Sequence, residues 1–404
     1  MKCQICSNEK LHKFLSLGNL PPSDGFLNEN ELNKTEVTCP INIFFCDNCK
    51  LVQLGHAVNP KLLFTDSFVY TTGSSGELVK NFSVLAEKLT EEFSLSSKDL
   101  VVDIGSNDGT LLENFMKSDI KVLGVDPSKA AKLALKKNIP TLFEFFNEET
   151  TQKILKENGK AKIITATNVF AHVKELDSFM QGIKLLLEDK GVFVEESHYL
   201  KNMVSEIEYD SIYAEHLRYY SLKPLIYLFE KFGMTVFDAE KISTHGGSLR
   251  VYACIKGNFP VSENVSRIIE EEEKAGLYSK KTFDDFSKRV SENREKLRNL
   301  LFKLKKEGNH IVGLGAPAKG NTLLNFCGIG NDTLDYLAEK QNLKIGKFSP
   351  GMHIKVVEES QVFSDQPEYA LLLAWNLKNI IIPKLKEKGF KGKIIVPIPE
   401  PAIF

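Results

Sequence analysis

The sequence predicts an α/β fold in three successive parts, and three observations support this prediction. Residues 75–257 alternate short apolar runs with helix-like stretches, as in a parallel sheet covered by helices on both faces. The segment from HIVGLGAPAKGN to the C-terminus alternates in the same way and predicts a second α/β domain. The first 70 residues differ, because they hold five of the seven cysteines and only short apolar runs. We therefore expect domains over residues 1–70, 71–260 and 261–404.

Individual elements follow from the same pattern. Four short apolar runs are expected to be buried parallel strands, namely LVVDIG, KVLGVD, KIITATNV and GVFVEE. The runs MTVFDAEKI and SLRVYACIKG are joined by THGGS, which is too short for a crossover helix, so we expect them to pair antiparallel. Residues 262–307 are charged and helical, and they are expected to bridge the second and third domains.

Composition and charge exclude several classes of partner. The net charge of −1 over 404 residues provides no field that would recruit nucleic acid or an anionic membrane. No apolar run approaches the roughly 20 residues of a membrane span, and the first residues, MKCQICSNEK, do not form a signal peptide. We therefore expect a cytoplasmic protein with reduced thiols, existing as a monomer or a weak homo-oligomer.

Two C-x2-C pairs, Cys3/Cys6 and Cys46/Cys49, predict a metal site. Two thiolates at this spacing hold one metal from a tight knuckle, and two knuckles complete a tetrahedral zinc site that is structural because it has no open position. One alternative is four thiols without metal. A nucleic-acid-binding finger is the other, but no basic aromatic patch accompanies the pairs.

A glycine turn follows the first expected strand of the central part. It contains Asp103, Gly105, Asn107 and Gly109, and it lacks the glycine spacing with which dinucleotide pyrophosphates are bound. Asp126 ends the next strand, 21 residues after Gly105, where an acid accepts ribose hydroxyls. The alternative is a plain structural loop, but the turn together with VDP resembles class I S-adenosylmethionine methyltransferases, and this resemblance predicts S-adenosylmethionine as the cofactor.

Further donor-site residues are expected from position alone. Pro127 follows Asp126. Phe146 and Asn147 follow the third strand, which lies before KIITATNV, and would flank the adenine, whereas Asn168 belongs to the end of KIITATNV, the fourth strand, near the methionine part.

Two clusters are candidates for an acceptor site. The segment YDSIYAEHLRYYS contains Tyr213, Glu215 and His216, and STHGGSLR contains His245 and Gly246. Histidine beside a carboxylate and phenols suits proton abstraction, because its ordinary pKa is near neutrality. The alternative is a surface helix with aromatic packing. His172 lies just past the fourth strand, at the sheet edge where ligands bind.

The chain resembles the sugar C-methyltransferase family, which includes the tetronitrose C-3 methyltransferase and its relatives. The matching motifs span nearly the whole chain and are the two C-x2-C pairs, FVYTTGSSG, DIGSNDG, VDP, ATNVFAHV, IYAEHLRYYS, THGGSLRVY, GLGAPAKGNTLLNFCGI, PGMHI, LLLAWNL and VPIPEP. The resemblance implies a zinc-binding N-terminal domain, a central class I methyltransferase (Rossmann-like) domain and a C-terminal α/β domain. It also implies methylation of a nucleotide-linked 4-keto deoxysugar at the carbon beside the ketone.

The resemblance also implies roles for individual residues. His216 or Tyr213 would be the base, and the sequence leaves both open. Glu215 would orient His216, His172 would donate a hydrogen bond to the enolate oxygen, and Tyr70 would lie near the donor.

The C-terminal glycine turn carries the remaining candidates. Lys319 and Asn321 would bind the diphosphate of a nucleotide-diphosphate sugar, whereas the alternative is a structural turn. Lys319 precedes its glycine, so the turn is not a P-loop. Two other functions remain open. One is methylation of a sugar hydroxyl or amine, and the other is a nicotinamide oxidoreductase, although we expect no acidic residue at the end of the following strand.

Overall fold

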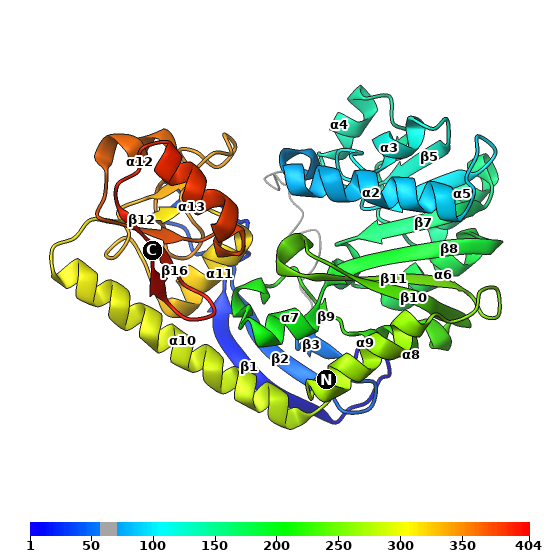
Figure 1. The fold of residues 1–404 in the computed structure, drawn as a ribbon, viewed down its shortest axis with the longest axis horizontal. Helices are drawn as coiled ribbons and strands as arrows, with labels where there is room; N and C mark the ends of the chain where they lie inside the picture. Colours follow the sequence, from blue (N-terminus) through cyan, green and yellow to red (C-terminus); the bar gives the residue numbers. More distant parts are fainter. Residues whose placement is uncertain (57–70) are drawn as a thin grey trace.

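The computed structural model describes residues 1–56 and 71–404. Figure 1 shows a small N-terminal sheet, a large central α/β unit and a C-terminal α/β unit, with helix α10 (Lys280–Lys306) running from the C-terminal unit along the N-terminal sheet. The mixed α/β architecture predicted from the sequence is confirmed. The expected domain boundaries stay predictions, and the first of them falls at the edge of the residues left undescribed.

The N-terminal sheet is built from two distant parts of the chain. Within the described residues its order is β1-β2-β3-β9, and all pairs are antiparallel. The first three strands are β1 (Leu11–Leu20), β2 (Cys39–Cys46) and β3 (Val52–Leu54). The fourth, β9 (Arg218–Tyr219), comes from the region expected to form the central domain. This sheet is therefore joined by strand pairing to the segment that holds Tyr213 and His216.

The central sheet has seven strands in the order β10-β11-β8-β7-β4-β5-β6. Its five parallel strands are β4 (Leu100–Ile104), β5 (Lys121–Val125), β6 (Thr141–Leu142), β7 (Ala161–Thr167) and β8 (Leu187–His198). The hairpin of β10 (Met234–Ile242) and β11 (Ser248–Ile255) adds antiparallel to β8, as expected. The order in which the strands are connected reverses between the parallel strands β4 and β7, and ligands bind at such a point in open α/β sheets.

Alternate side chains of these strands pack on opposite faces of the sheet. Val101 and Val122 belong to a core with α2 (Gly76–Glu92) and α3 (Leu112–Met116), whereas Val102 and Leu123 belong to a core with α6 (Leu176–Leu186) and α8 (Leu222–Lys231). Both faces are covered, which is why these strands are apolar runs rather than alternating ones. Further helices of this unit are α4 (Ala131–Lys136), α5 (Glu148–Asn158), α7 (Leu200–Ser205) and α9 (Glu263–Lys274).

The C-terminal sheet has six strands in the order β14-β13-β12-β15-β16-β17. They are β12 (Ile311–Leu314), β13 (Leu337–Glu339), β14 (Val356–Glu358), β15 (Tyr369–Leu372), β16 (Lys393–Val396) and β17 (Ala402–Ile403). The helices are α11 (Ala318–Cys327), α12 (Ser360–Asp365) and α13 (Lys378–Glu387). The direction of connection reverses between β12 and β15, so this unit has a binding edge of its own.

One hydrophobic core joins the N-terminal sheet to the C-terminal unit. It contains Phe14 and Phe45 from the first, Phe283 and Phe286 from α10, and residues of β12 to β16. The rings of Phe14 and Phe283 stack with centroids 4.9 Å apart. The helical segment expected to bridge two domains therefore also holds the N-terminal sheet in place.

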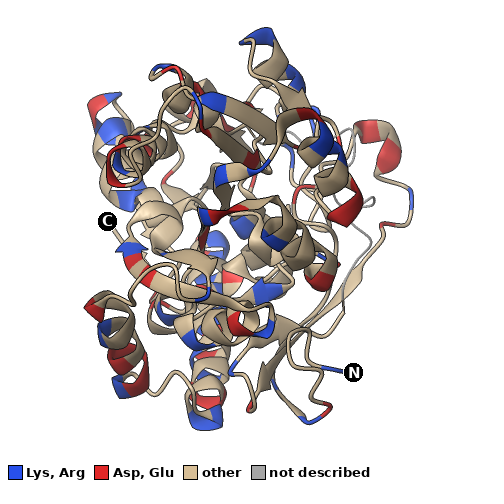
Figure 2. Ribbon diagram, turned by 90° about the vertical axis from the view of Figure 1, so that its right-hand side faces the viewer, with Lys and Arg blue, Asp and Glu red and all other residues tan. Residues whose placement is uncertain are grey.

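Among the described residues, none of the helices combines the length and apolar character required to cross a membrane. Figure 2 shows basic and acidic residues interspersed over the ribbon rather than separated onto opposite sides, in line with the net charge of −1.

Candidate functional site

The four paired cysteines come together beside the N-terminal sheet. The Sγ atoms of Cys3, Cys6, Cys46 and Cys49 all lie within 4.8 Å of one another, with 3.4 Å between Cys3 and Cys49 and 3.5 Å between Cys6 and Cys46. Four thiolates bound to zinc at about 2.3 Å are separated by similar distances. The predicted ligand set therefore fits a closed zinc site.

The glycine turn after β4 is held tightly around its backbone. Gly105 has a φ of +71°, and a Cβ atom added to it would lie 2.2 Å from a methyl group of Val169. Asp103 lies just before the turn and accepts a hydrogen bond from Thr165 at 2.6 Å. Burial raises the pKa of Asp103 to about 7, and the charge of Asp126 adds to this effect. Only glycine fits position 105.

Asp126 at the end of β5 braces this turn. Its Oδ2 accepts from the N–H of Asn107 at 2.8 Å, and its Oδ1 accepts from the N–H of Ser128 at 2.7 Å. Each carboxylate oxygen has a second lone pair, so the carboxylate retains acceptor capacity for ribose hydroxyls.

The other predicted donor residues differ in position. Pro127, Phe146, Asn147 and Asn168 line the same cavity as Asp126. Gly109 does not line it. A Cβ there would lie 2.4 Å from Ile139, so packing requires a glycine at this position. Tyr70 lies outside the described residues.

A single large cavity extends from this turn to the C-terminal unit. Its volume is about 1300 Å³, and all three units of the protein contribute to its wall. Sites for one ligand usually measure 300–1,000 Å³, so this cavity has room for two.

The acceptor candidates lie in the same cavity and form a hydrogen-bonded pair. The hydroxyl of Tyr213 lies 2.9 Å from His216 Nε2, and His216 Nδ1 lies 2.8 Å from the carbonyl oxygen of Ser211. A carbonyl only accepts, so Nδ1 carries the proton and Nε2 of the neutral ring accepts from Tyr213. Burial lowers the pKa of His216 well below its ordinary value and raises that of Tyr213 well above, so both are neutral.

Glu215 does not orient His216, contrary to expectation, because the Ser211 carbonyl occupies Nδ1. Its Oε1 instead accepts from the hydroxyl of Ser23 at 3.2 Å, and Oε2 is buried without a hydrogen-bond partner among the described residues. Burial raises the pKa of Glu215 to about 7, and the nearby Asp24 adds to the shift. The carboxyl group of Glu215 is therefore partly protonated at neutral pH.

His172 lines the cavity with its ring centroid 4.9 Å from that of His216. Its Nδ1 donates to the carbonyl oxygen of Glu215 at 2.7 Å, and burial lowers its pKa. The expected hydrogen bond from His172 Nε2 to an enolate oxygen would therefore require the protonated ring.

Lys319 reaches the cavity from the start of α11. Its Nζ lies 3.2 Å from the carboxylate of the buried Glu208 and 3.4 Å from the carbonyl oxygen of His245. The same carboxylate lies 2.8 Å from His198 Nε2. His245 lines the cavity. Its pKa is lowered to about 4, mainly by burial and further by the charge of Lys319. Gly246 is not part of the wall, and a Cβ there would lie 2.8 Å from Glu208.

Asn321 is also absent from the cavity wall. It is buried, and its side chain donates to the carbonyl oxygen of Ser23 at 2.7 Å. It therefore joins the C-terminal unit to the N-terminal loop, and nothing in its position favours contact with a diphosphate.

Sequence reasoning missed an acid in the C-terminal unit. Glu339 ends β13, next to β12, so the expectation that no acid would follow this turn is wrong. Its Oε2 accepts from the N–H of Ala316 at 2.8 Å, much as Asp126 accepts from Asn107. The two units thus place an acid at equivalent points, and Glu339 lines the same cavity.

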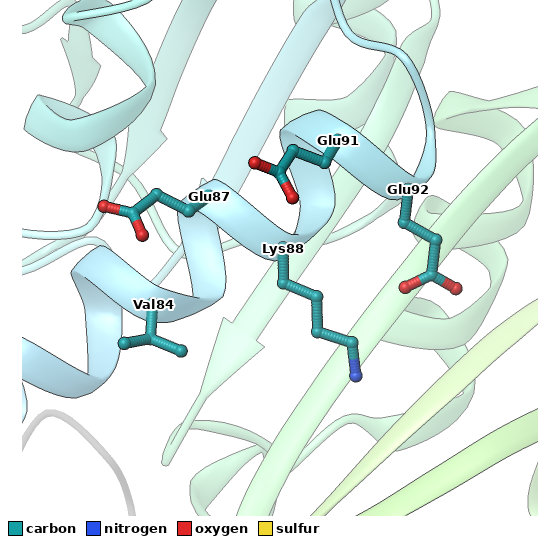
Figure 3. A pocket seen from close by; sticks show the side chains of 5 residues that line it. All are labelled: Val84, Glu87, Lys88, Glu91 and Glu92. Atoms are coloured by element: carbon teal, nitrogen blue, oxygen red, sulfur yellow. The ribbon is translucent and has the colours of Figure 1, made fainter.

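A second, shallow hollow lies on the outside of α2 (Figure 3). Its wall consists of Val84, Glu87, Lys88, Glu91 and Glu92 from this one helix. Lys88 is paired with Glu240 at 3.1 Å. We assign no function to this surface.

Comparisons with known proteins agree with the three-part architecture. Residues 3–64 match a zinc binding domain family, residues 79–239 a methyltransferase domain family, and residues 243–399 the C-methyltransferase C-terminal domain family. The curated C-methyltransferase NovU of Streptomyces niveus is 31% identical over 407 residues, covering 100% of this chain and 96% of NovU.

Solved structures that are similar to part of this chain include two methyltransferases. An S-adenosylmethionine-dependent methyltransferase from Clostridium acetobutylicum is 15% identical with a TM-score of 0.36, covering 44% of this chain and 92% of its own. One from Anabaena variabilis is 15% identical with a TM-score of 0.35, covering 44% and 85%.

Proposed function

This chain belongs to the S-adenosylmethionine-dependent sugar C-methyltransferase family, and we propose that it methylates the carbon beside the ketone of a nucleotide-linked 4-keto deoxysugar. The observation that carries the proposal is the neutral Tyr213–His216 pair, which lies in the same cavity as the donor turn. A hydroxyl or amine acceptor would not need a base that removes a proton from carbon.

The residues around the turn fit S-adenosylmethionine. Asp126 retains lone pairs for ribose hydroxyls, Gly105 leaves bare backbone, and Phe146 offers an aromatic face. The cofactor supplies an electrophilic methyl group when bound. The protein holds donor and acceptor at the distance of reaction.

We assign the removal of the proton to Tyr213 and His216 acting together. The lone pair of His216 Nε2 faces the Tyr213 hydroxyl, so a proton from the substrate carbon passes to the Tyr213 oxygen as the phenolic proton passes to Nε2. The products are an enolate and an imidazolium ion, and charge is conserved. Neither residue has to be ionised beforehand, which agrees with the direction of both pKa shifts.

The enolate oxygen needs a hydrogen-bond donor, and we assign this role to Glu215 rather than His172. A carboxyl group with a pKa near 7 carries a proton for part of the neutral range, and Oε2 has no partner among the described residues. Buried neutral carboxylic acids donate to developing oxyanions in this way.

The C-terminal unit is proposed to hold the nucleotide. Lys319 supplies positive charge beside its glycine turn, and Glu339 lies where Asp126 lies in the donor site. We therefore expect the nucleoside at the β12–β15 edge and the sugar pointing to Tyr213. Asn321, by contrast, is assigned to domain contact.

The test uses the full-length zinc-loaded protein, a nucleotide-linked 4-keto deoxysugar and deuterated water. With S-adenosylhomocysteine bound, deuterium should enter the carbon beside the ketone, and with the labelled methyl donor the label should appear on the same carbon. If neither exchange nor transfer occurs while S-adenosylhomocysteine binds, the enolate proposal is wrong. Label found on oxygen or nitrogen would assign the enzyme to another acceptor class.

A further inference from the structure

A loop of the zinc-bearing N-terminal unit enters the cavity beside the acceptor residues. It follows β1 and contains Ser23, which is buried, and Asp24, which lines the cavity. Asp24 Oδ1 lies 3.4 Å from Nζ of Lys344, a residue of the C-terminal unit. The loop therefore belongs to the N-terminal unit in sequence and to the acceptor site in space.

The loop is fixed from the side of the C-terminal unit. Leu27 and Phe348 exchange backbone hydrogen bonds of 3.0 and 2.9 Å, and Asn321 donates to the Ser23 carbonyl at 2.7 Å. A buried serine held at its backbone in this way has little freedom to move. Its hydroxyl donates to Glu215 Oε1 at 3.2 Å, across the boundary to the central unit.

We propose that Ser23 is a positioning residue, which donates to Oε1 of Glu215 and so places the carboxyl proton on Oε2. In the neutral acid, the oxygen that accepts the hydrogen bond from Ser23 is the carbonyl oxygen, and the acidic proton is on the other oxygen. The inference rests on the proposed function, because it concerns how Glu215 is prepared for the enolate. It gives the zinc-bearing unit a part in catalysis beyond stability.

The strand pairing of the N-terminal unit supports this assignment. The N–H of Leu54 in β3 donates to the carbonyl of Leu217 at 2.9 Å, and β3 pairs with β9 directly after the catalytic segment. Two of the predicted zinc ligands lie here, because Cys46 ends β2 and Cys49 lies in the turn between β2 and β3. The zinc-bearing unit thus contacts the Tyr213–His216 segment on one side through β3 and on another through Ser23.

The experiment compares Ser23→Ala with Ser23→Thr and with Ser16→Ala in the full-length zinc-loaded protein. Ser16 is an exposed serine of β1 in the same unit, so it controls for the loss of a hydroxyl. Ser23→Ala should lower kcat about tenfold with KM and S-adenosylhomocysteine affinity within about twofold, because a hydrogen bond to a reacting group is lost. Ser23→Thr should restore kcat, and Ser16→Ala should equal the wild type.

The second readout needs no substrate. Carbon-13 spectra of labelled glutamate carboxyls, with Glu215→Gln to identify the signal, should show that Ser23→Ala raises the pKa of Glu215, since the bond from Ser23 lowers it. Combining Ser23→Ala with Glu215→Gln should add no further loss of kcat. An unchanged Glu215 pKa, or losses that add, would overturn the inference. Failure of the proposed function would appear instead as a wild-type protein without exchange or transfer.

Discussion

Replacing Tyr213 by phenylalanine separates the two ways in which the proton could be removed. If the proton passes through the phenolic oxygen to His216, the variant loses the relay and keeps the shape of the site. General acid–base groups contribute about 10²–10⁴ in rate, which equals about 3–5 kcal/mol of activation free energy. We therefore expect kcat to fall by at least a hundredfold.

Stability should change less than activity. The hydroxyl of Tyr213 donates to His216 Nε2 at 2.9 Å, and its removal leaves a buried acceptor without this donor. Such a loss costs about 1–3 kcal/mol of unfolding free energy. The donor site is formed by other elements, so S-adenosylhomocysteine affinity should stay within about twofold of the wild-type value.

The assay is a single-turnover measurement of methyl transfer, with deuterium exchange and calorimetry of S-adenosylhomocysteine in parallel. Tyr220→Phe is the matched control, because Tyr220 is a buried tyrosine that does not line the cavity. If Tyr213→Phe retains more than about a third of the wild-type rate, the relay is refuted. His216 would then take the proton directly, because its Nε2 lone pair is no longer occupied by the Tyr213 hydroxyl.

Three further predictions concern the donor turn and the buried charges. Gly105→Ala should lower S-adenosylhomocysteine affinity at least tenfold and destabilise the fold, because a methyl would lie 2.2 Å from a valine side chain. The control is Gly159→Ala, at a glycine with φ +83° and no neighbour within 4 Å, which should show only the backbone cost of about 1–3 kcal/mol of unfolding free energy. Equal effects of the two substitutions on S-adenosylhomocysteine affinity in calorimetry would contradict this. Burial raises the pKa of Glu195 from 4.5 to about 8. Between these two pH values the folded protein binds more protons than the unfolded chain, so the unfolding free energy should fall as pH rises. Relative to Glu195→Gln, we expect the fall to be about 1.4 kcal/mol per pH unit. The measurement is the unfolding free energy of both proteins from urea titrations between pH 5 and about 8. If the two proteins show the same dependence on pH, that effect is excluded. Arg250→Ala should lower the unfolding free energy by about 3–5 kcal/mol, because it leaves the buried Glu196, 2.6 Å away, without its cation. A decrease of less than about 1 kcal/mol, measured by urea titration, would argue against a buried ion pair.

Local patterns were enough to predict the expected strands and to place most of the donor-site candidates at one edge of the sheet. The strand runs, the turn at Gly105 and Asp126 at the next strand end are separated by a few residues each, and parallel strands bring their carboxyl ends to one edge whatever surrounds them. The cysteine pairs were also predictable, because the geometry of each C-x2-C knuckle is determined locally. Only the approach of the two knuckles to each other depends on the tertiary structure.

The acceptor site depended on contacts between residues far apart in the chain. Glu215 was expected to face its neighbour His216, yet its partner is Ser23, 192 residues away. The tautomer of His216 is set by a backbone carbonyl, which no sequence pattern marks. The acid Glu339 was missed because the strand that it ends has only three residues.

The sequence alone therefore determined that a methyl donor and a zinc ion are bound, because those sites are made of short segments whose geometry follows from strand, turn and knuckle. Only the tertiary structure decided how the acceptor residues are paired. The hydrogen bonds of His216 to Tyr213 and Ser211 are local, but they form in a segment without a regular conformation. The bond from Ser23 to Glu215 depends on how the three units pack, and in that packing β9 joins the N-terminal sheet and the loop of Ser23 lies against the C-terminal unit. Side-chain direction in an irregular segment such as 209–217 is determined by such long-range contacts, and a single sequence contains no record of them.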